Sequence, residues 1–280
     1  MEKISVFCIL SSYLLASVFA LIRARRAKPW NSVLTLVAAG AGFFAHTMYL
    51  LVRSRDAELP PLLTSNHDWL LVLAWVAMFL YLFLTMLDRR LPLGIFVLPV
   101  VLVLVIASRF VSVEVSLSAA KLRETAQFGW VMLHTGFLVF GIVGVIGSLI
   151  LSLMYLLQHR RLKHGQGMAE GTRLPSLAKL ERWNWWSVVI SVPTLTLGMA
   201  AGVFLGLNSK EGGASLPFSD PLVIGSATGW LVMVCFFGWL IATRRPAAKQ
   251  VALLTVWACG FLLITVVGLQ VLLGTGHKML

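Results

Sequence analysis

Two histidines interrupt apolar runs of this sequence that are long enough to cross a lipid bilayer. His46 lies near the end of the second such run, and His134 lies about two helical turns into residues 128–157, where nearly every other residue is apolar, aromatic or glycine. Ionisable side chains inside membrane segments are costly, so they mark a ligand, a proton path or a buried hydrogen bond. His67 and His277 lie just outside apolar runs, so they are further candidates for such chemistry.

The composition indicates that membrane helices position these histidines. Hydrophobic residues make up 59% of the 280-residue chain and charged residues only 12%, against about 25% in soluble proteins, and the mean hydropathy is +0.88. We therefore predict an all-α, polytopic integral membrane helix bundle that forms a single domain over residues 1–280. The predicted transmembrane segments are residues 4–22, 31–52, 69–87, 93–111, 128–157, 184–207, 221–243 and 250–274, eight in all.

The basic residues predict the orientation of these helices. The sequence RARRAK, residues 23–28, follows the first segment and only Lys3 precedes it, which is the reverse of the charge order in a secretory signal. If residues 23–28 are cytoplasmic, the inner loops hold 15 Lys and Arg residues, and the outer loops and termini hold the remaining 8. We expect both termini on the outer face of the membrane. Because the loops account for the net charge of +12, we expect no nucleic-acid binding.

His46 and His134 lie at a similar depth in this topology, about 9 Å below the outer boundary at 1.5 Å per residue. Paired neutral imidazoles are natural axial ligands of haem iron, and haem needs an apolar cleft lined by aromatic side chains. The aromatic residues near this level are Phe43, Phe44, Tyr49, Trp69, Trp130 and Phe137. The residues alone leave two interpretations open: the two histidines coordinate haem iron, or each forms a hydrogen bond to a neighbouring helix.

Glycines recur at helical spacing in the fifth and sixth segments. The two sets are Gly141, Gly144 and Gly147, which recur every third residue, and Gly198, Gly202 and Gly206, which form GxxxGxxxG. Small residues at such spacing let helix backbones approach closely inside a membrane. We predict helix packing rather than nucleotide binding, because no strand or phosphate loop accompanies these glycines.

No motif predicts an independent enzyme. The sequence lacks GxSxG, HExxH, a Walker A motif and a CxxC pair, and without CxxCH the chain is not itself a c-type cytochrome. Cys8, Cys235 and Cys259 are each isolated in an apolar run, which is typical of small buried hydrophobic residues. We therefore expect binding or transfer rather than catalysis.

Four sequence stretches carry a resemblance to a known family. The stretches are LHTGFLVFGIVGVIGSLILSLMYLLQHRRLK from residue 133, LPSLAKLERWNWWSVVISVPTLTLGMAAGVFLGL from residue 174, AHTMYLLVR from residue 45 and LLVLAWVAMFLYLFL from residue 70. They resemble the cytochrome c assembly protein family, specifically its HemX-like, eight-helix branch. In that family a histidine opens one helix, Tyr-Leu-Leu-Gln and a basic stop close it, and Leu-Pro-Ser-Leu-x-x-Leu-Glu leads to the next span.

One segment departs from the family pattern. Members that export haem or attach it to cytochrome c carry W-x-W-D-P-K-E, a platform for exposed haem. Here residues 216–222 read LPFSDPL, which keeps Asp220 and Pro221, with Trp230 ten residues after Asp220. The missing tryptophans and lysine favour the HemX-like branch.

The resemblance implies a protein of a bacterial inner membrane that binds b-type haem near the outer, periplasmic face, transiently or stably, in cytochrome c maturation or in haem supply. The residues assigned to this role are His134 and His46 as axial ligands of the haem iron, His277 and His67 as alternative ligands, and Trp130, Asp220 and Trp230 as haem contacts. The expected partners are membrane lipid, haem and other cytochrome c maturation proteins.

An alternative function is a membrane scaffold or regulator with the same fold but without stable haem binding. It would act through the loop at residues 158–183 on a cytoplasmic partner, for example in tetrapyrrole synthesis. In this stretch, residues 159–182 carry six basic and two acidic residues.

The loop between the second and third segments is rich in charged residues. We expect Arg53, Arg55, Glu58 and Asp68 to form a solvated outer surface, where an arginine can also pair with a haem propionate. A small-molecule transporter lacks support, because we predict no buried acidic residue and find no inverted repeat.

Overall fold

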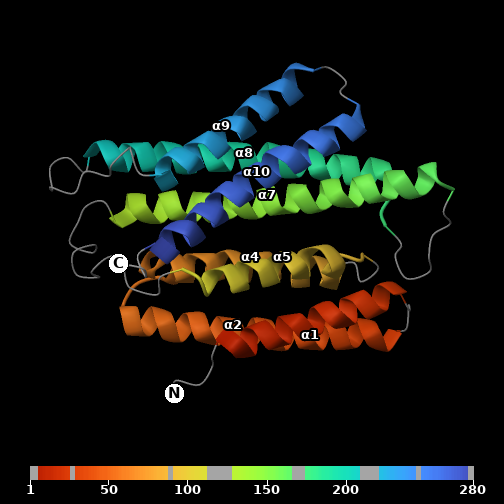
Figure 1. Cartoon of the computed structure of the whole chain (residues 1–280), viewed down its shortest axis with the longest axis horizontal. Coiled ribbons are helices and arrows are strands. Elements are labelled where there is room, and N and C mark those ends of the chain that lie inside the picture. Colours follow the sequence, from red (N-terminus) through yellow and green to blue (C-terminus); the bar gives the residue numbers. More distant parts are fainter. Residues whose placement is uncertain are drawn as a thin grey trace. The chain divides into compact units, whose positions relative to one another are not determined.

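The computed structural model of the chain describes residues 6–25, 29–87, 91–111, 128–165, 174–208, 221–243 and 247–276. Within these ranges every regular element is a helix (Figure 1). The helices are α1 (Val6–Arg25), α2 (Pro29–Ala57), α3 (Pro61–Thr64), α4 (Asn66–Leu87), α5 (Gly94–Ser108), α7 (Phe128–Lys163), α8 (Leu177–Asn208), α9 (Pro221–Ala242) and α10 (Ala248–Gly276).

This architecture confirms the predicted all-helical, multi-pass membrane protein. Among the described residues, seven helices are long and apolar enough to span a membrane, and α5 is a shorter apolar helix of 15 residues. A helix of that length is about 22 Å long at 1.5 Å per residue. Each of the eight predicted segments therefore contains one apolar helix. The orientation of the termini and the single-domain organisation stay predictions.

The helix ends differ from the predicted segments where polar residues continue a helix. α2 runs to Ala57, and Glu58 then ends it in a left-handed conformation with φ of 53°. α7 continues to Lys163 and α8 begins at Leu177, so both helices extend into the predicted loop at residues 158–183. Hydropathy marks the part of a helix that lies in lipid, whereas Gln, Arg, Lys and Glu are good helix formers that lengthen it beyond the membrane.

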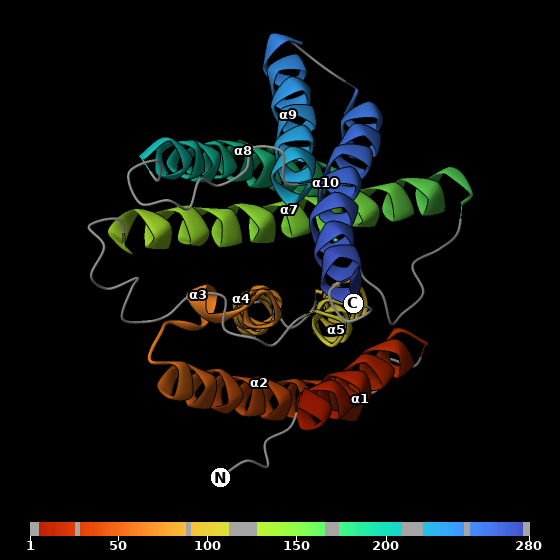
Figure 2. The ribbon, with the colours of Figure 1, turned by 60° about the vertical axis from the view of Figure 1, so that its left-hand side comes forward.

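The described chain divides into two compact units. The first comprises residues 1–113 and 158–176, and the second comprises residues 114–157 and 177–280. In the first unit α1 packs against α2 and α5, and α4 packs against α2 and α5, so four helices enclose one core. Figure 2 shows α4 and α5 nearly end-on while α1 and α2 lie across the view, so the two pairs cross.

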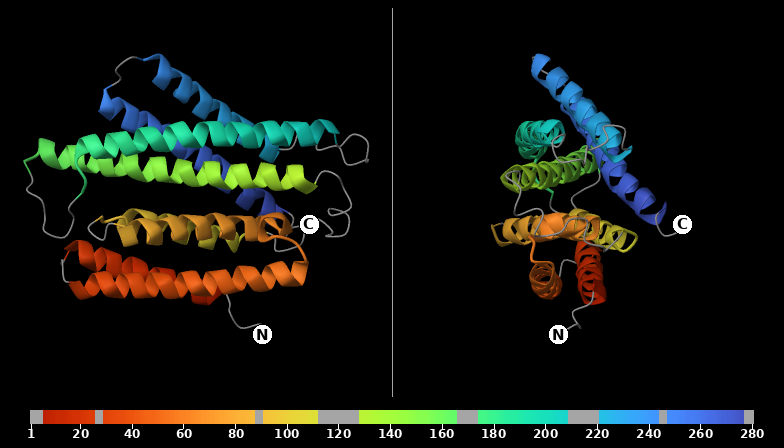
Figure 3. Two further views of the ribbon diagram at one scale, coloured as in Figure 1. Left: turned by 180° about the vertical axis from the view of Figure 1, so that it is seen from behind. Right: turned by 90° about the vertical axis from the view of Figure 1, so that its left-hand side faces the viewer.

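In the second unit α7 and α8 run in opposite directions, as the left view of Figure 3 shows, and the right view shows the two helices side by side. α9 and α10 form another adjacent pair, inclined to the first, and α8 contacts both of them. Two polar contacts link these pairs: the Trp230 indole N–H donates to the Thr196 hydroxyl at 3.1 Å, and the Asn184 amide donates to the Thr255 hydroxyl at 3.4 Å.

The predicted role of the glycines is confirmed between α7 and α8. A Cβ atom on Gly141 would lie 2.6 Å from the side chain of Leu195 and 3.1 Å from its backbone nitrogen. A Cβ on Gly144 would overlap Ser191. Real Cβ atoms do not approach other atoms so closely, so these positions let the two helices meet at backbone distance.

The prediction of buried cysteines holds for Cys259 only, since Cys8 and Cys235 are exposed on their helices. An apolar run does not tell which residues of a membrane helix face other helices and which face lipid, because both surroundings are apolar. Trp257 illustrates the lipid-facing class, with 75% of its side chain exposed on α10.

Candidate functional site

His134 lies on α7 and faces α8. Its Nδ1 is 2.7 Å from the backbone carbonyl oxygen of Gly198. A carbonyl oxygen can only accept a hydrogen bond, so Nδ1 carries the proton and the neutral ring keeps a lone pair on Nε2. The described residues form no hydrogen bond to this Nε2. The side chain is half-buried. Its Nδ1 is held by the hydrogen bond to Gly198, and its Nε2 is open.

The absence of a side chain at Gly202 makes room for this ring. A Cβ atom on Gly202 would lie 2.6 Å from the imidazole Cε1 of His134 and 2.9 Å from its Nδ1. One turn earlier on α8, a Cβ on Gly198 would lie 3.0 Å from the Leu138 side chain and 3.2 Å from the Leu138 backbone nitrogen. The ring therefore lies directly against the surface of α8.

Aromatic side chains lie beside His134. Trp130 is four residues before it and therefore on the same face of α7. The Trp130 ring contacts Phe204 of α8 with centroids 4.4 Å apart, and both side chains are about two-fifths exposed, at 43% and 41%. Trp230, another predicted contact, is half-buried, and its indole N–H is bound to Thr196 of α8. Asp220 and His277 lie outside the described residues.

His46 belongs to the first unit and is fully buried. Its Nδ1 is 3.1 Å from the hydroxyl of Tyr13 on α1, and the two rings meet edge to face. Gly42 makes room for Tyr13, since a Cβ there would lie 2.6 Å from the tyrosine ring. The backbone of Leu71 lies near the imidazole. However, Nε2 of His46 forms no hydrogen bond with any described residue. A buried imidazole nitrogen without a partner is costly, so it calls for a ligand or a bound water.

His67, on α4, has partners at both nitrogens. Its Nδ1 donates to the backbone carbonyl of Ser108 on α5 at 2.6 Å, and its Nε2 accepts from the hydroxyl of Tyr49 on α2 at 3.3 Å. The side chain is 1% exposed. These bonds leave no lone pair for a metal. Because they reach α5 and α2, His67 links α4 to both of these helices.

The predicted solvated surface beside His67 is wrong for Asp68, whereas Arg53 is still 23% exposed. Arg53 makes two hydrogen bonds to Asp68, at 2.9 and 3.3 Å, and Asp68 is completely buried. The Asp68 carboxylate also accepts from the Ser65 hydroxyl at 2.9 Å. The prediction that no acidic residue is buried is therefore wrong, and the oxygens of this carboxylate are bonded to Arg53 and Ser65.

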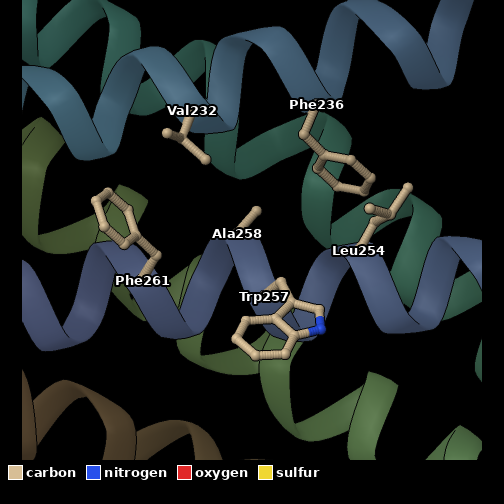
Figure 4. Close-up of a pocket in the computed structure, with 6 residues that line it drawn as sticks. All are labelled: Val232, Phe236, Leu254, Trp257, Ala258 and Phe261. Atoms are coloured by element: carbon tan, nitrogen blue, oxygen red, sulfur yellow. The ribbon is translucent and has the colours of Figure 1, made fainter.

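An apolar depression of about 310 Å³ lies between α9 and α10 (Figure 4). Its lining is Val232, Phe236, Leu254, Trp257, Ala258 and Phe261. The side chains offer no metal ligand, acid or base, so this depression has no catalytic chemistry of its own. Among the described residues, no group of three or more His, Cys, Asp or Glu side chains can hold a metal ion.

Several partners of the histidines were not predictable from their positions in the sequence. Tyr13, Tyr49 and Gly202 decide which ring nitrogens are open, yet each resembles many other residues of its segment. Only Gly202 had a signal, the four-residue spacing of glycines in its helix.

The helices and the two open histidines define a multi-pass membrane protein that presents imidazole nitrogens from within its spans. Residues 63–277 match the Cytochrome C assembly protein family, and the chain belongs to that family. No curated protein and no solved structure matches the chain. Membership confirms the resemblance to the family and supports a role in cytochrome c maturation and haem handling. The HemX-like branch stays a prediction.

Proposed function

We propose that the protein binds haem as cargo, with Nε2 of His134 as an axial ligand of the iron. The observation that carries the proposal is the hydrogen bond from His134 Nδ1 to the Gly198 carbonyl. Histidines that bind metals characteristically donate their other ring N–H to a carbonyl or carboxylate, which fixes the tautomer and the ring orientation. His134 has this arrangement, and its Nε2 is unpartnered.

The surroundings of His134 suit a large planar apolar ligand. Trp130 and Phe204 present partly exposed rings close to it, and the flanking α7 and α8 surfaces are apolar. Haem supplies an iron that accepts a nitrogen lone pair, and the chain supplies the oriented imidazole and the aromatic contacts. The Nδ1 proton stays on the bond to Gly198, so binding at Nε2 requires no proton to leave the ring.

The other predicted ligands differ in how well they fit this role. His46 remains a proposed second ligand, because its buried Nε2 has no described partner. It lies before the family match, which starts at residue 63, whereas His67, His134 and His277 lie within it. His67 does not fit, because both of its nitrogens are hydrogen-bonded.

We also propose that the haem site is on the periplasmic side of a bacterial inner membrane, since positive-inside loops place this end of α7 outward. Other cytochrome c maturation proteins are the proposed partners.

The test is a titration of the full-length, detergent-purified protein with hemin, followed by visible spectra of the oxidised and reduced states. Wild type, His134→Ala and His46→Ala are compared, with His164→Ala as a control just beyond the opposite end of α7. We expect the His164 variant to match wild type and the His134 variant to lose the axial-histidine spectrum. An unchanged spectrum in His134→Ala contradicts the proposal. A wild type that binds no hemin favours the scaffold that acts through residues 158–183.

A further inference from the structure

We propose that α8 positions the His134 ring through Gly198 and Gly202, so the glycine repeat orients a ligand in addition to packing two helices. This inference rests on the proposed function of His134. The two glycines have different parts: Gly198 supplies the carbonyl that holds Nδ1 at 2.7 Å, and Gly202 supplies the space in which the ring lies.

The four-residue spacing of these glycines has a direct structural reason. In an α-helix the carbonyl of residue 198 points toward residue 202 and already accepts its backbone N–H. Each Cβ is tilted toward the N-terminus of its helix, so a side chain at 202 would cover the carbonyl of 198. Glycine at 202 leaves room for the His134 ring to reach the second lone pair of that carbonyl.

A methyl group at Gly202 would collide with the His134 ring rather than with the backbone of α7. Its carbon would lie 2.6 Å from Cε1 and 2.9 Å from Nδ1 of His134, and the next contact is Nε2 of the same ring at 3.6 Å. Because the nearest three atoms all belong to one side chain, the ring turns away and the helices stay together. Turning the ring breaks the bond to Gly198 and frees the proton to move to Nε2, where it blocks coordination.

Two other glycines of α7 provide matched controls. A Cβ on Gly141 would collide with Leu195 in the same α7–α8 interface without touching His134, so Gly141→Ala tests packing alone. A Cβ on Gly136, two residues after His134, would meet no atom within 4 Å, so Gly136→Ala tests the added methyl group alone.

The experiment measures hemin affinity and the visible spectrum of full-length Gly202→Ala, Gly141→Ala and Gly136→Ala. Loss of an outer hydrogen bond to a metal-binding histidine typically weakens metal affinity about 10–100-fold, and we expect a loss in this range for Gly202→Ala. Gly136→Ala should match wild type. Gly141→Ala should unfold at a lower temperature but keep the wild-type spectrum. Wild-type affinity in Gly202→Ala, or an equal loss in Gly141→Ala, overturns the inference.

A second measurement uses the haem-free protein, so that it does not depend on the proposed function. Diethyl pyrocarbonate modifies unprotonated imidazole nitrogens, and mass spectrometry gives the modification rate of His134 relative to His164. We expect the relative rate to change in Gly202→Ala and to stay constant in the two controls. An unchanged rate in Gly202→Ala contradicts the positioning role even if wild type binds no hemin.

A third variant covers the case in which Gly202→Ala fails to fold. Replacing His134 with Nδ1-methylhistidine removes the donor and leaves both glycines intact. We expect a similar loss of hemin affinity, and wild-type affinity would show that the bond to Gly198 is not needed.

Discussion

His134 in the second unit and His67 in the first are anchored in the same way but differ at their other nitrogen. Each ring donates from Nδ1 to the backbone carbonyl of a neighbouring helix, at 2.7 Å for Gly198 and 2.6 Å for Ser108. Nε2 of His67 then accepts from Tyr49, whereas Nε2 of His134 has no described partner. One histidine is a structural tie and the other is a candidate ligand, and position along the helix does not distinguish them.

The two surroundings explain this difference. His67 lies at a junction of α2, α4 and α5 that also contains the Arg53–Asp68 ion pair. Both nitrogens of His67 and the Asp68 carboxylate are bonded to other protein groups there. Around His134 the neighbours are glycines and aromatic rings, which fill space without offering a hydrogen bond to Nε2. We therefore propose that a ligand-binding histidine in this fold is distinguished by the absence of a hydrogen-bond partner at Nε2.

The largest effect should come from breaking the junction of the first unit. Arg53→Met leaves the fully buried Asp68 carboxylate without its cation, and breaking a buried ion pair typically costs about 3–5 kcal/mol. Chemical unfolding in detergent measures this loss. Arg55→Met is the control, because Arg55 lies two residues after Arg53 and is exposed. Equal stability of the two variants would show that the junction is not a structural centre.

A direct comparison of the two histidines should give the next largest effect. We expect His134→Ala to lower hemin affinity about 100-fold or more, which corresponds to about 2.7 kcal/mol, since it removes the ligand itself. His67→Ala should reduce stability and leave hemin affinity near that of wild type. Hemin titration monitored by absorbance measures both variants. The reverse pattern would exchange the roles assigned to the two residues.

Removing the partner of His67 should make the two histidines more alike. Tyr49→Phe deletes the hydroxyl that donates to Nε2, which should cost about 1 kcal/mol of stability. Diethyl pyrocarbonate should then modify His67 faster than in wild type. Tyr81→Phe serves as the control, because Tyr81 is a buried tyrosine of α4, whereas the His67 ring is bonded to Tyr49 and Ser108. No change in the rate would mean that burial, rather than the hydrogen bond, protects this ring.

The smallest effect should come from the aromatic contact beside His134. Trp130→Ala removes the ring that packs against Phe204, and such ring contacts contribute about 0.5–1.5 kcal/mol. We therefore expect hemin affinity to fall about 2–10-fold with the axial-histidine spectrum retained. Trp186→Ala, a change at an exposed tryptophan of the opposite end of α8, should leave affinity unchanged. Loss of the spectrum itself would instead make Trp130 essential to the coordination of the iron.

Hydrophobic runs and glycine spacing predicted much of the fold. The eight apolar segments each contain a helix, and the glycines of α7 and α8 do meet the opposite helix closely. Length and periodicity carry this information because a membrane helix needs about 20 apolar residues, and because small residues permit close approach. The helix ends at Ala57, Lys163 and Leu177 were missed, since hydropathy does not report the polar turns beyond the membrane.

The candidate site was only partly predictable. Depth along the helix singled out His46 and His134, but it says nothing about rotation around the helix axis. That rotation decides that His46 meets Tyr13 and that His134 meets Gly198. The Arg53–Asp68 pair was placed in a solvated loop because charged residues near a membrane boundary are usually exposed, whereas here Ser65 and Arg53 satisfy the buried carboxylate.

Chemical rescue tests the role of His134 most directly. His134→Gly removes the imidazole, and free imidazole added to the hemin-loaded variant can occupy the vacated position. We predict that the variant lacks the axial-histidine spectrum and regains it as imidazole is added, whereas His67→Gly has the wild-type spectrum without imidazole. A His134→Gly variant that keeps the wild-type spectrum, or one that imidazole does not restore, would contradict coordination of the iron by His134.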